Sequence, residues 1–254
     1  DKIFYQNSGT EANEAMIKMA RKYGIEKYGP NRYHIVTAKD GFHGRTYGAM
    51  SATGQPGNGC QVGFGPMTYG FSYAPYNDLK AFKDACTENT IAIMIEPVQG
   101  EGGFIPAPIE WVKAVRKICD DHGIMMICDE VQCGWARSGK MFASQYFKDA
   151  GCAPDIMSTA KSIAGGMPLS AVTARAEIMD AVPGGTIGGT YGANAVSAAS
   201  ALAVIDVMTR DDYPAKAMHI ADVVGKRFNE WKDKYECVGD VRGTGAMIGI
   251  EFVK

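Results

Sequence analysis

The sequence predicts an α/β fold in which a mostly parallel sheet is covered by helices on both faces. Apolar runs of strand length alternate with helix-length segments along most of the chain. This rhythm is typical of parallel sheets, whose strands are buried on both faces. Polar and charged residues follow the strand ends, where such sheets bind ligands. We therefore expect a ligand site at the carboxyl edge of the sheet.

The composition is that of an ordinary globular protein and excludes several functional classes. The chain has 254 residues, of which 46% are hydrophobic and 21% charged, enough for one or two domains. A net charge of −2 argues against nucleic-acid binding. No apolar run reaches the roughly 18 residues of a membrane span, and no signal-peptide pattern opens the chain. The seven cysteines and four histidines are scattered, which argues against a metal site and favours reduced thiols in the cytoplasm.

The first strand–turn–helix unit predicts an anion site. Residues 2–6 have the pattern of a strand, and residues 11–23 that of an amphipathic helix. Ser8, Gly9 and Thr10 lie between them, where the free N–H groups and dipole of a helix N-terminus favour a phosphate. A simple N-cap by Ser8 or Thr10 explains the same pattern.

The second strand, residues 33–38, precedes a glycine-flanked aromatic and an arginine. Phe42 is suited to lie flat on a ring ligand, and Arg45 offers a planar fork for a carboxylate. His43 is as compatible with packing as with catalysis. Taken alone, Phe42 in the core and Arg45 on the surface are equally ordinary interpretations.

The next segments continue the alternation. We expect a glycine-rich loop over residues 54–70, strands over 70–74 and 91–95, and helices over 77–86 and 109–122. Pro108 and Gly123 fit the start and end of the last of these helices. Glu96 ends the strand at 91–95, and Glu101 lies in the glycine-rich loop that follows.

Two further strand ends carry an acid and an amine. Asp129, Val131 and Gln132 follow the strand 124–128, and Lys161 follows the strand 156–160. Burial would lower the pKa of Lys161 and make its amine nucleophilic, although a lysine reaching out to solvent is the commoner case. An amine for a Schiff base and a carboxylate for a pyridine nitrogen are what pyridoxal 5'-phosphate (PLP) requires. Neighbouring Glu130 is expected to point to the opposite face.

The remaining residues divide the chain. We expect a strand over 169–173, a loop over 183–192, helices over 193–208 and 211–234, and a hairpin of strands 238–242 and 246–253. Residues 1–205 would form a large PLP-binding domain, and residues 206–254 the beginning of a smaller C-terminal α+β domain. Because the chain starts on a strand without methionine and ends directly after another strand, we expect a piece of a longer protein.

Seven motifs resemble those of the class III aminotransferases, which are PLP enzymes of fold type I with a seven-stranded sheet. They occur in the family's order and cover almost the whole chain. They are Ser8-Gly-Thr-Glu-Ala-Asn-Glu14, Phe42-His-Gly-Arg-Thr46, Ile95-Glu-Pro-Val-Gln-Gly-Glu-Gly-Gly103, Asp129-Glu-Val-Gln132, Arg137-Ser-Gly-Lys140, Ala160-Lys-Ser-Ile-Ala-Gly-Gly166 and Gly189-Thr-Tyr-Gly192.

The resemblance implies a role for each matching residue. Lys161 would form the Schiff base and move the substrate proton, and Asp129 would bind the pyridine nitrogen. The other implied roles are ring sandwiching by Phe42 and Val131, a contact of Gln132 with the ring hydroxyl, phosphate binding by Gly9 and Thr10, lining of the pocket by Glu96, carboxylate binding by Arg45, and pairing of Glu101 with a switchable arginine. Thr190 would bind the phosphate of a neighbouring subunit, which implies a homodimer with shared sites.

The resemblance also implies a reaction. Residues 161–170 are most similar to 4-aminobutyrate aminotransferases, whereas residues 10–14 and 51–55 are more similar to acetylornithine aminotransferases. We expect transamination of an ω-amino acid like 4-aminobutyrate, with 2-oxoglutarate as acceptor. The alternatives are an acetylornithine or ornithine aminotransferase, an amino-acid racemase on the same fold, and an inactive PLP-binding fragment.

Overall fold

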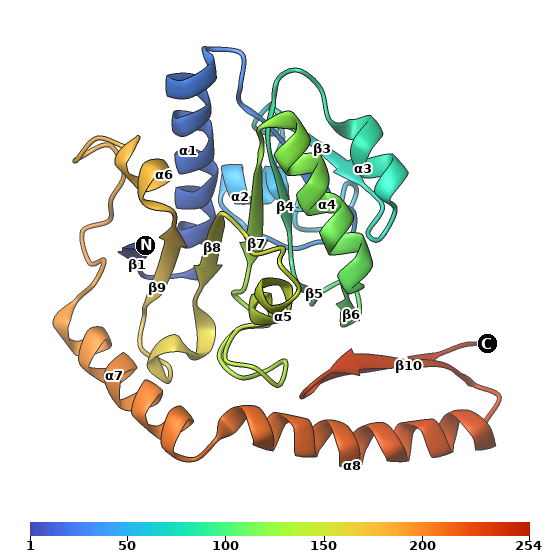
Figure 1. Cartoon of the computed structure of the whole chain (residues 1–254). Helices are drawn as coiled ribbons and strands as arrows, with labels where there is room; N and C mark the ends of the chain where they lie inside the picture. The colour runs from blue at the N-terminus through green and yellow to red at the C-terminus, as the bar shows by residue number, and fades with distance from the viewer.

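The computed structural model describes residues 1–254 and is built around a seven-stranded sheet with the order β1-β9-β8-β7-β4-β2-β3 (Figure 1). The strands from β3 to β8 in this order pair in parallel, whereas β9 is antiparallel to both of its neighbours. Their bounds are β1 Lys2–Gln6, β2 His34–Ala38, β3 Phe71–Ala74, β4 Thr90–Ile95, β7 Met125–Asp129, β8 Ile156–Thr159 and β9 Ser170–Ala174. The prediction of a mostly parallel seven-stranded sheet is confirmed.

Helices cover both faces of the sheet because the central strands are apolar on both sides. In β7, Met125 and Ile127 belong to the core beneath α1, whereas Met126 and Cys128 belong to the core beneath α4. The first core also holds side chains of α2 and α6, and the second holds those of α3 and α5. The helix bounds are α1 Gly9–Tyr28, α2 Tyr47–Ala52, α3 Leu79–Ala85, α4 Ile109–His122, α5 Ser144–Asp149 and α6 Ala176–Asp180.

Several short elements were absent from the sequence prediction. They are α2, α5, α6, the 3-10 turn η1 (Lys161–Ala164) and the two-residue strands β5 (Val98–Gln99) and β6 (Ile105–Pro106). None of them is long enough to show a helical or strand period. Helix α1 runs to Tyr28, beyond the expected end at residue 23, and ends at Gly29, whose φ of 95° suits glycine.

The C-terminal elements leave the sheet. Helix α7 (Ala195–Arg210) and helix α8 (Tyr213–Lys234) run below it in Figure 1, and the hairpin of β10 (Val238–Thr244) and β11 (Met247–Phe252) forms a separate two-stranded sheet packed on α8. The division of the chain after residue 205 stays a prediction. No helix has the length and apolar character needed to cross a membrane.

Candidate active site

The strand ends meet at a cavity of about 230 Å³. Most of the predicted site residues line it, and two further residues, Asn13 and Gly44, line it as well. The predicted residues on its wall are Gly9, Thr10, Phe42, His43, Arg45, Glu96, Asp129, Val131, Gln132 and Lys161. The carboxyl edge of the sheet therefore gathers residues that are far apart in the sequence, as expected for an α/β fold.

Asp129 is the most heavily hydrogen-bonded carboxylate of the cavity. It is buried, with an exposed fraction of 3%. Its Oδ2 accepts from Asn13 Nδ2 at 2.7 Å and from His43 Nδ1 at 2.8 Å, and its Oδ1 accepts from the backbone N–H of Val131 at 2.9 Å. Ser158 Oγ lies 3.3 Å from Oδ1. A buried carboxylate needs such donors to remain charged.

Glu130 points away from the cavity, as predicted. Its carboxylate accepts from the backbone N–H groups of Ala143 and Ser144, at the start of α5, and from the thiol of Cys133. Adjacent acids at the end of β7 therefore serve different purposes, because consecutive side chains of a strand face opposite sides.

The N-terminus of α1 forms one wall of the cavity. Ser8 does not line the cavity; it is the N-cap, and its Oγ accepts from the N–H of Glu11. Gly9 packs so closely on Val131 that a Cβ at this position would lie 2.7 Å from Val131 Cγ1. The hydroxyl of Thr10 lies 2.8 Å from that of Thr46. The first N–H groups of a helix lack backbone partners within the helix, and Gly9 and Thr10, which begin α1, line the cavity.

Lys161 departs from its predicted environment. It follows β8 at the first position of η1, and its side chain is exposed rather than buried. The expectation of a desolvated lysine is wrong, because the chain leaves the sheet after Thr159 and turns outward with a φ of 47° at Lys161. Such a φ is uncommon for a residue with a side chain. The amine makes no hydrogen bond or ion pair with the rest of the chain and is free to reach into the cavity.

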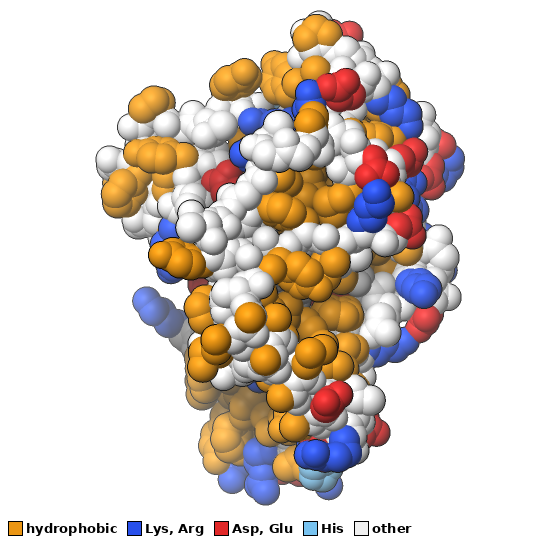
Figure 2. Space-filling model, turned by 90° about the vertical axis from the view of Figure 1, so that its left-hand side faces the viewer, with side chains coloured by type: hydrophobic (Ala, Val, Ile, Leu, Met, Phe, Trp, Pro, Cys, Tyr) orange, Lys and Arg blue, Asp and Glu red, His pale blue; other side chains and the backbone are white.

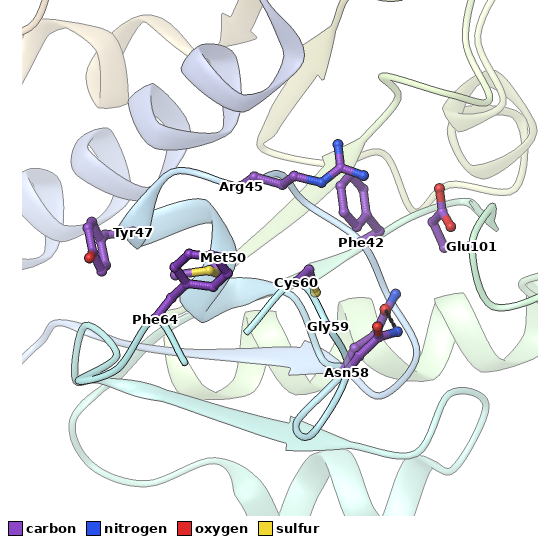
Figure 3. Close-up of a pocket in the computed structure, with 10 residues that line it drawn as sticks. Phe42, Arg45, Tyr47, Met50, Asn58, Gly59, Cys60, Phe64 and Glu101 are labelled. Carbon is purple, nitrogen blue, oxygen red and sulfur yellow. Dashed lines mark hydrogen bonds between the residues drawn. The ribbon is translucent and has the colours of Figure 1, made fainter. Parts of the chain in front are cut away.

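A second cavity of about 550 Å³ adjoins the first and shares Phe42 and Arg45 with it (Figure 3). The guanidinium of Arg45 lies over the Phe42 ring, 5.0 Å from its centroid. Glu101, which does not line the first cavity, lies on the wall of the second. The other side chains of this second cavity mix apolar and amide groups and include Tyr47, Met50, Gln55, Asn58, Cys60 and Phe64.

Glu96 joins the loop that carries Phe42 to the loop that carries Glu101. Its Oε2 accepts from the N–H of Phe42 at 3.1 Å, and its Oε1 accepts from the N–H of Gly100 at 3.2 Å. Burial raises the pKa of Glu96 from 4.5 to about 7, against the lowering influence of His43. For His43, burial lowers the pKa, but the hydrogen bond and charge of Asp129, together with the charge of Glu96, outweigh burial and raise it.

Two contributors to the site were missed from the sequence, and one predicted contributor lies elsewhere. Asn13 is a buried polar residue on an otherwise apolar face of α1, one turn after Thr10, and that pattern was the available signal. Gly44 lies against Thr10, where a Cβ would approach Thr10 Oγ1 to 2.3 Å. Thr190 lies on an exposed loop outside both cavities.

Comparison with known proteins gives one consistent result. The family model "Aminotransferase class-III" matches residues 1–254. The acetylornithine aminotransferase of Caldanaerobacter subterraneus is 44% identical, over 98% of this chain and 62% of that protein, and the one of Methanocaldococcus jannaschii is 43% identical, over 99% and 62%. The solved ornithine aminotransferase of Toxoplasma gondii has a TM-score of 0.91 at 30% identity, covering 100% of this chain and 60% of that one. The chain thus spans less than two thirds of the length of these proteins.

We expect replacement of Glu96 by glutamine to change how stability depends on pH. A carboxyl whose pKa is raised by folding contributes stability below its unfolded pKa of 4.5, and this contribution is lost as pH rises through about 7. The free energy of unfolding in urea is measured for Glu96→Gln and for the parent at about pH 5 and pH 8. From the lower to the higher pH, the variant should gain roughly 2 to 3 kcal/mol of stability relative to the parent. Glu236→Gln, at an exposed position, is the control and should follow the parent. A pH-independent difference for Glu96→Gln contradicts this assignment.

Proposed function

The chain belongs to the class III aminotransferase family, and from this premise we propose that it binds PLP and transfers an amino group to 2-oxoglutarate. The observation that carries the proposal is the meeting of the Asp129 carboxylate and the Lys161 amine on one cavity. When bound, PLP supplies an electron sink for the carbanion of the amino donor.

The cavity suits this cofactor at each of its ends. The N-terminus of α1 favours a phosphate, and Gly9 leaves no side chain in the way. Phe42 and Val131 offer flat and branched apolar surfaces for a ring, and Asp129 offers a charged acceptor for a protonated ring nitrogen. The donor set therefore fits the chemistry of the group.

We propose the following roles for the residues of the chain. Lys161 would hold the cofactor covalently through Nζ, and the same amine would take the proton from the amino-bearing carbon of the donor. Asp129 keeps the ring nitrogen protonated by charge pairing. Gln132 contacts the ring hydroxyl, and Gly9 and Thr10 bind the phosphate.

We propose an N-acetylornithine-like donor instead of 4-aminobutyrate. Relatives named acetylornithine aminotransferase support this choice. Arg45 is placed to pair with a donor carboxylate at the border of the two cavities. The adjoining cavity of about 550 Å³, with the amides of Gln55 and Asn58, suits a longer donor with a polar end. Glu101 on the same wall is the candidate partner of a switchable arginine.

We also propose a cytoplasmic homodimer with shared sites. All seven cysteines are free, which suits a reducing compartment. Figure 2 shows hydrophobic side chains gathered on the face that carries β1 and α7. Ile3 on β1, and Val196, Leu202 and Ile205 on α7, are between 39% and 67% exposed. Patches of this kind mark interaction surfaces, and a second copy on this face is the route by which Thr190 would reach a neighbouring phosphate.

The donor is tested on the full-length protein. N-acetylornithine, ornithine, 4-aminobutyrate and β-alanine are each supplied with 2-oxoglutarate, and glutamate formation is measured. We expect kcat/KM for N-acetylornithine to exceed that for 4-aminobutyrate by about 100-fold, because only the longer donor fills the adjoining cavity. Loss of chirality of an amino acid without any oxo acid would instead support a racemase, and no turnover on any donor would support an inactive cofactor-binding protein.

The two acids at the end of β7 should respond differently to neutralisation. Asp129→Asn should slow single-turnover reaction with donor by about 100-fold or more, because two unit charges near 4 Å interact by about 4 kcal/mol at an effective dielectric of 20. Glu130→Gln should cost far less, because Glu130 binds the start of α5.

Covalent attachment of the cofactor distinguishes a slower reaction of Asp129→Asn from loss of the cofactor-binding site. After borohydride treatment, peptide mass spectrometry should find the cofactor on Lys161 in the parent and in both acid variants, but not in Lys161→Ala. The placement of the ring nitrogen would be refuted if Asp129→Asn reacted with donor as fast as the parent, or if Glu130→Gln lost most of its single-turnover rate.

The dimer is tested on α7. Leu202→Glu should lower the mass in sedimentation equilibrium from dimer to monomer, and Thr190→Ala should weaken PLP affinity about tenfold while leaving the dimer intact. Val223→Glu, the same kind of change at an exposed position of α8, is the control. A Leu202→Glu protein that stays dimeric excludes this face.

A further inference from the structure

Asn13 connects three segments of the cavity wall. It lies on α1 with an exposed fraction of 2%. Its Nδ2 donates to Asp129 Oδ2 and to the backbone carbonyl of His43, both at 2.7 Å. A carboxamide has two N–H donors, so both are used. Asn13 thereby ties α1 to the end of β7 and to the loop that carries Phe42.

Ser158 completes this arrangement from the neighbouring strand. It is fully buried on β8 and is the register partner of Asp129. Its Oγ lies 2.8 Å from Asn13 Oδ1 and 3.3 Å from Asp129 Oδ1. A hydroxyl has one hydrogen to donate, so it serves one of these two acceptors at a time.

The amide of Asn13 decides which acceptor that is. Reversing the carboxamide would set its oxygen against the Asp129 carboxylate and the His43 carbonyl, so Oδ1 must face Ser158. Oδ1 of Asn13 has no donor other than this hydroxyl, and the contact is the shorter of the two. The Ser158 proton therefore goes to Asn13 and leaves Asp129 Oδ1 without it.

One acceptor position of Asp129 remains open as a result. A carboxylate has about four lone-pair positions. On Oδ2, Asn13 and His43 fill both, and on Oδ1 the N–H of Val131 fills one. We propose that Asn13 and Ser158 act together as positioning residues that keep the last Oδ1 position of Asp129 open for the ring nitrogen of the cofactor. This inference rests on the proposed function.

If Asn13 and Ser158 only supported the fold, removing either side chain would weaken cofactor binding in every background. The proposed role predicts a different result. Without the Asn13 carboxamide, the Ser158 hydroxyl retains only Asp129 Oδ1 as a partner in this cluster and fills the open position. Removing the hydroxyl as well opens the position again. The Ser158→Ala change should therefore weaken cofactor binding slightly in the parent and strengthen it in an Asn13→Ala protein.

The test is a double-mutant cycle on the full-length protein, with PLP as the probe. The dissociation constant of PLP is measured by fluorescence quenching for the parent, Asn13→Ala, Ser158→Ala and the double variant. We expect Asn13→Ala to weaken binding about 30-fold and Ser158→Ala about threefold, since bonds to charged groups carry about 1.5 to 3 kcal/mol. The double variant should bind about tenfold more tightly than Asn13→Ala.

Controls distinguish an effect on the open acceptor position of Asp129 from an effect on folding stability. Ser170→Ala removes a buried hydroxyl that has no partner and should leave the PLP affinity unchanged. Thermal unfolding of each cofactor-free variant reports on folding. Asn13→Val, which fills the space with an apolar side chain that cannot donate, replaces Asn13→Ala if that protein does not fold.

The outcomes are distinct. A parent that does not take up PLP refutes the proposed function itself. If the parent binds PLP but Ser158→Ala weakens binding in both backgrounds, or Asn13→Ala has no effect, the inference about Asn13 and Ser158 is overturned while the proposed function stands. The reversal of sign between the two backgrounds supports it.

Discussion

A buried carboxylate at the end of β7 is the constraint on which the rest of the site depends. Asp129 is almost inaccessible to water, so the protein itself must supply its hydrogen-bond donors. These donors come from α1, from the loop after β2 and from the chain just beyond β7. Satisfying one charge therefore fixes how a helix, a loop and a strand end meet, and the cavity lies where they meet.

Two glycines make that meeting possible. Gly9 lies against Val131, and Gly44 lies against Thr10, at distances that no Cβ would allow. The N-terminus of α1 can thus approach the strand ends closely enough to share a cavity with Asp129 and Lys161. Larger residues at these positions would push the N-terminus of α1 away from Asp129 and Lys161.

Charge is divided among three buried acids by their partners. Asp129 faces the cavity and stays hydrogen-bonded to donors, whereas Glu130 faces the other way and caps the start of α5. Glu96 receives only two backbone N–H groups, and burial dominates its pKa. A carboxylate therefore lines the cavity at Asp129, binds the start of a helix at Glu130 and joins two loops at Glu96.

The sequence by itself determined the alternation of strands and helices, the strand ends at Asp129 and Lys161, and the resemblance to class III aminotransferases, because these depend on local pattern and composition. Its preference for a 4-aminobutyrate-like donor is not supported by the relatives, which are named acetylornithine aminotransferases. Only the tertiary structure decided that Lys161 is exposed, that Asn13 and Ser158 surround Asp129, and that short helices such as α2 and α5 form. The hydrogen bonds of Asn13 with Asp129 and with Ser158 join residues 116 and 145 positions apart, and no local period encodes such contacts.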